Sequence, residues 1–237
     1  MKYDRVSWIL ALVLSHAGSV NGSACTIATE LAWQRLSPTV NRLDDKGAGY
    51  AVASIGPFFS PTLRQTLLEK MEAEFRDNPK RAAFLSLERP LHPDAEWDYS
   101  QVPKSMEPEA RVLLDFAQRL NHKVGPWRDL RERSYVSEVE LRLIKGTSQR
   151  QGLQVLQWHQ DLGWCRAVIT LDGPGTLYTD ADNTIPDGSF MNVRDEGRVK
   201  TVQQGDVLLL TGDAWHASPP SNHRLVLIVT FLPRSDG

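Results

Sequence analysis

Apolar stretches with the spacing of β-strands occupy much of the second half of the chain. Residues 164–171, 205–210 and 224–231 are largely apolar, and the last of these is almost continuously so, as in a strand buried on both faces. Residues 153–160 are rich in β-forming and apolar residues and are also predicted to form a strand. Between residues 139 and 144 every second side chain is apolar, which predicts a strand with one apolar face, formed by Val139, Leu141 and Leu143.

The first half contains two segments with helical periodicity. One is predicted to begin at Pro61, with Ser60 as its N-cap, and to stop before Asn78-Pro79; its apolar stripe consists of Leu63, Leu67, Met71 and Phe75. The other spans about residues 108–122 and has one apolar side, formed by Val112, Leu113, Phe116 and Leu120. We expect both helices to brace one sheet formed by the strands of the second half.

Candidate chemistry begins where the predicted strand at 153–160 reaches His159-Gln160-Asp161. Residues two apart on a strand share a face, so an imidazole and a carboxylate are expected side by side. They are two of the three ligands of a 2-His-1-carboxylate facial triad, which holds Fe(II) and leaves coordination positions open. His216 fits as the third ligand because it follows another predicted strand and a turn. Metal binding is then expected to weaken as pH falls through about 6–6.5, since ligand imidazoles must be neutral.

Arg224 opens the most apolar of the predicted strands. A buried, unpaired guanidinium is costly, so an arginine at this position needs an anionic partner. A dicarboxylate co-substrate would provide one, and so would an internal Asp or Glu. An isolated His-x-Asp pair is also compatible with an ordinary surface ion pair. The combination of this pair with a later His216 and with Arg224 favours the metal site.

The order of His159-Gln160-Asp161, His216 and Arg224 resembles that of the Fe(II)/2-oxoglutarate-dependent dioxygenases, over about residues 138–233. The resemblance implies a mainly β fold with flanking helices, whose core is a double-stranded β-helix (jelly roll) braced by the N-terminal helices. It implies Fe(II) and 2-oxoglutarate as cofactors, with the first three residues as metal ligands and Arg224 on the distal carboxylate of 2-oxoglutarate. Tyr178 is a further candidate for that carboxylate, although its position is more typical of a core or surface tyrosine.

The same resemblance implies an oxygenase that hydroxylates a substrate and releases succinate and CO2. The substrate, a small molecule or a protein side chain, is not identified by the sequence. A cupin-like metalloenzyme that does not use 2-oxoglutarate remains an alternative, but it has no need of Arg224. A non-catalytic metal-binding protein that has kept the site is a further alternative, which metal-dependent succinate formation distinguishes. Residues 173–176 and 216–220 also resemble, more loosely, a bacterial family of unassigned function.

Net charge and cysteine content exclude some classes of binding partner and of structural site. The 237 residues carry a net charge of −2, which gives no electrostatic reason to expect nucleic acid. Two cysteines, Cys25 and Cys165, exclude a disulfide-dense scaffold and a multi-cysteine zinc site. Cys165 lies in a largely apolar run and is expected to be buried.

The N-terminus has the layout of a secretory signal peptide. Basic residues are followed by a nearly apolar stretch at 6–14, too short to span a bilayer, and then by Gly22-Ser23-Ala24. We therefore expect a signal peptide at 1–24 and an exported protein; an N-terminal helix packed on a cytoplasmic domain is the alternative. Residues 25–134 are expected to form a helical and irregular part, and residues 135–235 the β-helix core. The loop at 89–104 contains three prolines and is long enough to act as a lid.

Overall fold

The computed structural model describes a set of segments that together contain the predicted helices and most of the predicted strands: residues 50–53, 59–77, 84–89, 95–124, 134–145, 156–161, 165–211, 214–221 and 223–233. The predicted signal peptide, Cys25 and part of the 89–104 loop lie outside the described residues. Within them, no helix has both the length and the apolar character required to cross a membrane.

Three antiparallel sheets and two long helices make up the described fold. A six-stranded sheet has the order β1-β9-β4-β11-β3-β2, a three-stranded sheet the order β10-β5-β8, and β6 pairs with β7. The elements are β1 (Tyr50–Ala53), α3 (Pro61–Asp77), β2 (Phe84–Glu88), α4 (Glu107–Val124), β3 (Ser134–Lys145), β4 (Cys165–Asp172), β5 (Leu177–Thr179), β6 (Thr184–Asp187), β7 (Phe190–Val193), β8 (Lys200–Thr201), β9 (Val207–Thr211), β10 (Trp215–Ala217) and β11 (His223–Pro233), with short 3-10 helices at Lys104–Met106, Ala181–Asn183 and Glu196–Arg198. The predicted mainly β fold with flanking helices is confirmed.

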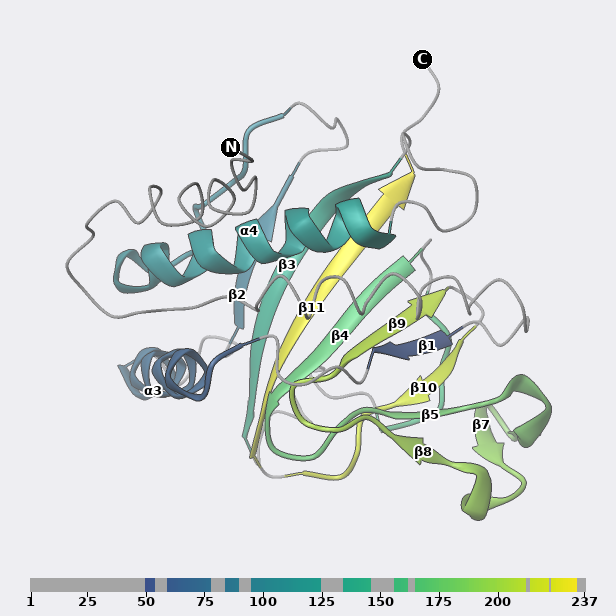
Figure 1. The fold of residues 1–237 in the computed structure, drawn as a ribbon. Coiled ribbons are helices and arrows are strands. Elements are labelled where there is room, and N and C mark those ends of the chain that lie inside the picture. The colour runs from purple at the N-terminus through teal and green to yellow at the C-terminus, as the bar shows by residue number, and fades with distance from the viewer. Residues whose placement is uncertain are drawn as a thin grey trace, which may run out of the picture.

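Helices α3 and α4 cover one face of the six-stranded sheet (Figure 1). The backbone N–H of Leu63 donates to Ser60 Oγ at 3.1 Å, so Ser60 caps α3 as predicted, and α3 ends one residue before Asn78. The larger apolar core lies between this face and the helices. Its fully buried members include Leu67, Phe116, Leu141, Ile169, Leu209, Leu227 and Cys165, and the burial of Cys165 confirms its prediction.

The opposite face of the same sheet points toward β5 and β10 and carries a smaller apolar cluster, to which Ile144, Val168, Tyr178, Leu208 and Val226 belong. On β3 this face holds polar residues that are nevertheless enclosed, because Glu140 is only 6% exposed and forms an ion pair with Arg142. The predicted apolar face of β3 is confirmed, because Val139, Leu141 and Leu143 are fully buried in the larger core. Both faces are covered, one by helices and the other by the barrel interior.

The strand predicted at residues 153–160 is not observed where the segment is described. Residues 156–161 form only two isolated bridges, Trp158 with Met191 and His159 with His216. The segment contacts β7 and β10 at one residue each, so no ladder of hydrogen bonds develops on either side. Residues 156–161 instead form a short irregular segment, called the 156–161 crossing below, which places His159 next to β10.

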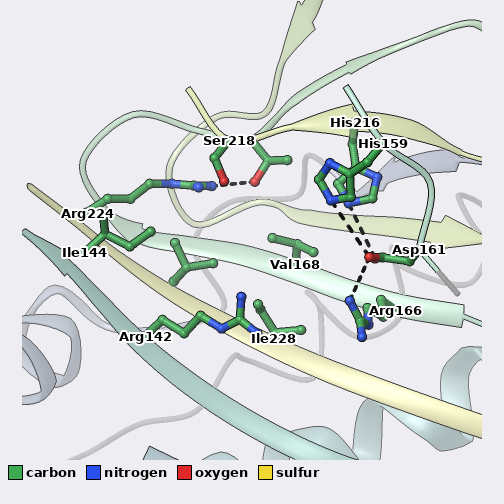
Figure 2. A pocket seen from close by; sticks show the side chains of 12 residues that line it. Arg142, Ile144, His159, Asp161, Arg166, Val168, His216, Ser218, Arg224 and Ile228 are labelled. Carbon is green, nitrogen blue, oxygen red and sulfur yellow. Dashed lines mark hydrogen bonds and ion pairs between the residues drawn. The ribbon is translucent and has the colours of Figure 1, made fainter. Parts of the chain in front are cut away.

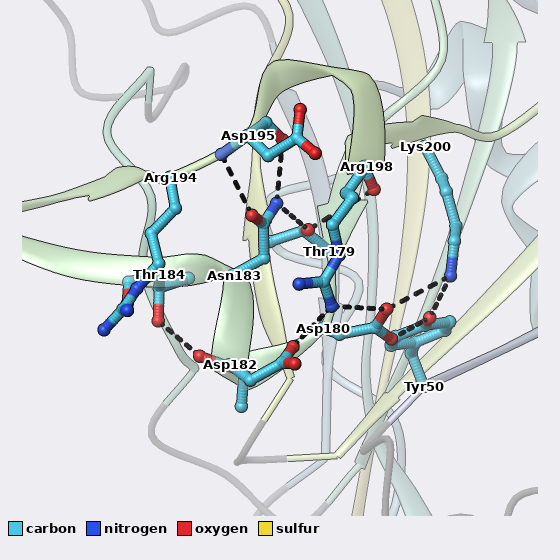
Figure 3. Close-up of polar contacts among 11 residues, drawn as sticks. Tyr50, Thr179, Asp180, Asp182, Asn183, Thr184, Arg194, Asp195, Arg198 and Lys200 are labelled. Atoms are coloured by element: carbon cyan, nitrogen blue, oxygen red, sulfur yellow. Dashed lines mark hydrogen bonds and ion pairs between the residues drawn. The ribbon is translucent and has the colours of Figure 1, made fainter.

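Residues 180–200 form a folded insertion between β5 and β9, and most of its residues are exposed or half-buried. The fully buried Asn183 amide holds it together: its Nδ2 donates to Thr179 Oγ1 at 2.9 Å and to the Asp195 carbonyl at 3.0 Å, and its Oδ1 accepts from the Asp195 N–H (Figure 3). At its base, Lys200 Nζ donates to the Tyr50 hydroxyl at 2.6 Å, which ties the insertion to β1. The insertion is therefore a fixed part of the barrel rim.

Candidate metal centre

Three side chains capable of binding a metal converge inside the barrel. His159, Asp161 and His216 each offer one ligand atom, and these atoms all lie within 4.8 Å of one another. His216 Nε2 is 3.4 Å from Asp161 Oδ2, and His159 Nε2 is 3.9 Å from Asp161 Oδ1. Two imidazole nitrogens and one carboxylate oxygen in this arrangement match the donor set of a 2-His-1-carboxylate iron site.

Backbone contacts fix both histidines in the orientation that a metal requires. His159 and His216 form an antiparallel bridge in which each N–H donates to the carbonyl of the other, at 3.0 and 3.1 Å. The Nδ1 atom of His159 lies 2.9 Å from the Gln157 carbonyl, and that of His216 lies 3.0 Å from the Ala214 carbonyl. A carbonyl oxygen only accepts, so each Nδ1 carries a proton, and in the neutral imidazole Nε2 then has the lone pair that a metal binds.

The electrostatics of the site keep the carboxylate charged and His159 neutral. Burial raises the pKa of Asp161, but the hydrogen bond and charge of His216, together with Arg166 and His159, outweigh burial and lower it to about 2. Burial, followed by the proximity of His216, lowers the pKa of His159. At neutral pH the site therefore holds a deprotonated carboxylate and a neutral His159, the forms that bind metal.

Arg224 lies in the same cavity and is almost completely enclosed, at 2% exposure. One terminal nitrogen, Nη2, donates to Thr170 Oγ1 at 3.1 Å and to Thr176 Oγ1, while Nε has no hydrogen-bond partner. Burial lowers the pKa of Arg224 to about 10, and no carboxylate of the described residues forms an ion pair with it. The guanidinium is thus a buried charge with donors still available for an anion.

A cavity of about 280 Å³ connects the metal-binding side chains with Arg224. Figure 2 shows His159, Asp161 and His216 converging on one side of the view and Arg224 entering from the other. Apolar side chains from three strands of the large sheet line the space, namely Ile144, Val168, Val226 and Ile228. An elongated ligand with an anionic end could therefore reach from the metal position to the guanidinium.

The structure brings together four of the five residues singled out in the sequence. Tyr178 is not among the residues that line the cavity. Its ring instead packs edge-on against Tyr50, with centroids 4.7 Å apart, and Lys200 lies above it. His223, the residue before Arg224, does not line the cavity; its ring nitrogens lie 3.2 Å from carboxylate oxygens of Glu72 and Asp172.

Sequence reasoning missed Arg166, Arg142 and the two threonines that contact Arg224. Arg166 Nη1 donates to Asp161 Oδ1 at 2.8 Å, and Arg166 and Arg142 both line the cavity. Alternation along the predicted strand at 164–171 places residue 166 on the face of 168 and 170, which was the available signal. The apolar pattern identifies the other face, with Ala167, Ile169 and Leu171, as the core face. It does not indicate that the mixed face with Arg166 is also covered.

Comparisons with known proteins give the fold of the chain. The family model DUF1826, described as a protein of unknown function, matches residues 136–227. No curated protein matches the chain. Three similar solved structures are a prolyl 4-hydroxylase from Phytophthora capsici (14% identity, 92% of this chain and 69% of that chain covered, TM-score 0.55), a 2OG-Fe(II) oxygenase family oxidoreductase from Burkholderia pseudomallei (14%, 83% and 89%, 0.50) and HygX from Streptomyces hygroscopicus with nickel and 2-oxoglutarate bound (15%, 84% and 87%, 0.50).

The predicted jelly-roll core is confirmed by this likeness. The fold of the chain is that of 2OG-Fe(II) oxygenases, over most of its length. At identities near 15% the likeness concerns the fold and leaves the reaction to be argued from the site.

Proposed function

We propose that the chain is an Fe(II)- and 2-oxoglutarate-dependent oxygenase that hydroxylates a substrate and releases succinate and CO2. One observation carries the proposal: a His-Asp-His ligand set and a buried arginine without an acidic partner among the described residues line one cavity. The fold is shared with a solved protein that holds nickel and 2-oxoglutarate, which supports the assignment.

His159, Asp161 and His216 would hold the metal through His159 Nε2, one Asp161 oxygen and His216 Nε2. In both histidines, Nδ1 is hydrogen-bonded to a backbone carbonyl, which favours the tautomer whose Nε2 can bind metal. When bound, Fe(II) with 2-oxoglutarate supplies the oxidising chemistry that such sites perform. The chain itself contributes the rigid bridge between His159 and His216, which fixes the spacing of the two imidazoles.

Arg224 would bind the distal carboxylate of 2-oxoglutarate. A guanidinium can hold a carboxylate with two parallel charge-assisted hydrogen bonds, and the buried position strengthens both. Thr170 and Thr176 keep the side chain extended into the cavity. Apolar walls formed by Ile144 and Val226 suit the methylene groups between the two ends of the co-substrate. Tyr178 is not included in the proposed site.

Calorimetry tests the binding step of this proposal directly. The Mn(II)-loaded protein is titrated with 2-oxoglutarate and, as a matched probe, with glutarate, which has both carboxylates but lacks the keto oxygen. We expect 2-oxoglutarate to bind more tightly than glutarate, and only when metal is present. Metal binding without any 2-oxoglutarate binding would overturn the proposal and favour a cupin-like or purely metal-binding protein.

Mass spectrometry then tests the reaction. The protein is incubated with Fe(II), ascorbate, 2-oxoglutarate and a mixture of candidate substrates, and products are searched for the gain of one oxygen. Succinate formation that requires both the metal and intact Asp161 is the expected result. Succinate formation that persists in Asp161→Ala would exclude the proposed centre as its origin.

A further inference from the structure

Arg166 is the residue most closely associated with the candidate metal ligands without being able to bind metal itself. It lies on β4, and its Nη1 donates to Asp161 Oδ1 at 2.8 Å. The other oxygen of the same carboxylate, Oδ2, is the one 3.4 Å from His216 Nε2. The two oxygens of Asp161 are therefore not equivalent: Oδ1 accepts from the guanidinium and lies 3.9 Å from His159 Nε2, whereas Oδ2 has the shorter approach to a histidine and no contact with Arg166. Figure 2 shows Arg166 on one side of the Asp161 carboxylate and the two histidines on the other.

An ordinary stabilising ion pair does not account for this contact. The Arg166 side chain is 30% exposed and that of Asp161 13%, so solvent on the arginine side limits what the pair contributes to stability. Its Nε is buried and has no hydrogen-bond partner among the described residues, which is a further cost. A guanidinium next to a divalent cation is also repelled by it. A role in the site itself explains why an arginine occupies this position.

We propose that Arg166 is a positioning residue for the metal ligand Asp161. By holding Oδ1, it leaves Oδ2 as the single oxygen that this carboxylate offers to the metal, and it prevents Asp161 from occupying two coordination positions. This inference rests on the proposed function, because a metal that must also accept a chelating keto acid needs those positions open. Partners of this kind, which orient a ligand, typically affect metal affinity or activity 10- to 100-fold.

Arg142 provides a matched comparison within the same cavity. It also comes from the inner face of the large sheet, lines the cavity and holds a carboxylate, with Nε and Nη2 at 2.7 and 2.6 Å from the oxygens of Glu140. Glu140 is not among the candidate metal ligands. Removing either arginine thus removes one positive charge and one carboxylate contact from the cavity, but only Arg166 contacts a ligand.

The experiment compares Arg166→Gln, Arg166→Lys and Arg142→Gln with the wild-type protein, after circular dichroism and thermal melting establish that each is folded. Mn(II) affinity is measured by calorimetry, followed by 2-oxoglutarate affinity at saturating Mn(II). We expect Arg166→Gln to weaken Mn(II) binding about 10- to 100-fold and to weaken 2-oxoglutarate binding as well. Arg166→Lys, which can still donate to Oδ1, should recover most of both, and Arg142→Gln should bind Mn(II) within about threefold of wild type.

Two results would overturn the inference while leaving the proposed function intact. One is a folded Arg166→Gln variant that binds both Mn(II) and 2-oxoglutarate as tightly as the wild type. The other is an equal loss of Mn(II) affinity in Arg142→Gln and Arg166→Gln, because a general effect of cavity charge would then explain both. A wild-type protein that binds no Mn(II) would instead overturn the metal site itself, together with this inference.

Discussion

The most informative single residue is Arg224, because its charge is buried and has no acidic partner among the described residues. Its guanidinium is 2% exposed, and two threonine hydroxyls are its hydrogen-bond partners. Neutral hydroxyls accept hydrogen bonds but do not compensate the charge. The depressed pKa of Arg224, caused by burial, reflects the same imbalance. An incoming carboxylate would provide both the charge and the missing acceptors.

Arg224→Ala is therefore expected to lose 2-oxoglutarate affinity and to retain metal. Truncating one partner of a buried charge pair costs roughly 2–5 kcal/mol, which is roughly 30- to 4000-fold in affinity at about 1.4 kcal/mol per decade. Lysine should restore only part of it, since an ammonium lacks the planar fork. Calorimetry of 2-oxoglutarate with the Mn(II)-loaded variants measures both effects. A folded Arg224→Ala variant with wild-type affinity would show that the distal carboxylate is held elsewhere.

Metal binding should depend on pH through competition between protons and metal for His159 Nε2. The pKa of His159 is lowered by burial and by His216, so this imidazole stays neutral below the usual histidine range near 6.5. The contribution of His159 to metal affinity is therefore expected to persist through that range and to fall at lower pH, later than the sequence alone suggests. Mn(II) titrations between about pH 8 and pH 5 test the sign. Affinity that rises as pH falls would contradict it.

At the scale of elements, the turn between β4 and β5 holds Arg224 in place. Gly173 has φ of +83°, and a Cβ there would lie 2.6 Å from the His223 carbonyl oxygen. At Gly175 a Cβ would lie 1.7 Å from the Val202 carbonyl oxygen, next to the bond from Val202 N–H to Thr176 O. The two glycines allow the turn to pack directly on neighbouring backbone, and this packing delivers Thr176 to the guanidinium.

Gly175→Ala is accordingly expected to weaken 2-oxoglutarate binding as well as stability. Relieving the overlap requires a backbone shift, and overpacking of this kind costs typically about 1–3 kcal/mol. Gly188→Ala is the matched control, because Gly188 has φ of +61° with nothing near the added Cβ. That variant should show only the backbone cost of about 1–2 kcal/mol and unchanged 2-oxoglutarate affinity. Equal affinities in both variants would mean that the turn does not position Thr176.

The elements also show where sequence reasoning reaches its limit. Helix α3 was predictable to within a residue, because Ser60 and Pro61 are local signals that act through the helix's own backbone. The crossing at 156–161 was not, since its β-forming composition gives no information on whether neighbouring strands offer a continuous ladder. The candidate ligands His159, Asp161 and His216 could be predicted from their residue types and their spacing along the sequence alone. The contact between Arg166 and Asp161 could not be predicted in the same way, because it depends on β4 passing next to Asp161 in the folded structure.

At the scale of the whole molecule, the central feature is the six-stranded sheet, of which one face packs against helices and the other lines the cavity. One face packs against α3 and α4 and contains the larger apolar core. The other carries charged residues, among them Arg142, Arg166 and Arg224, into the cavity. Because β3, β4 and β11 contribute to both faces, the apolar core directly supports the strands that position the site. The rigidity needed to hold a metal geometry thus comes from packing on the far side of the same strands.

Metal binding should consequently raise the stability of the whole molecule, because the ligand set exists only when β10, the 156–161 crossing and the sheet are assembled. At a free metal concentration of 100 times Kd, linkage adds about 2.7 kcal/mol. For a chain of this size that is roughly 5–10 °C in Tm, at 2–4 °C per kcal/mol. Thermal melts with and without Mn(II) measure the shift, and Asp161→Ala should remove it while leaving the melt without metal cooperative. An equal Tm increase in Asp161→Ala would mean that Mn(II) stabilises the protein at another position, and the His159–Asp161–His216 centre would then be the wrong assignment.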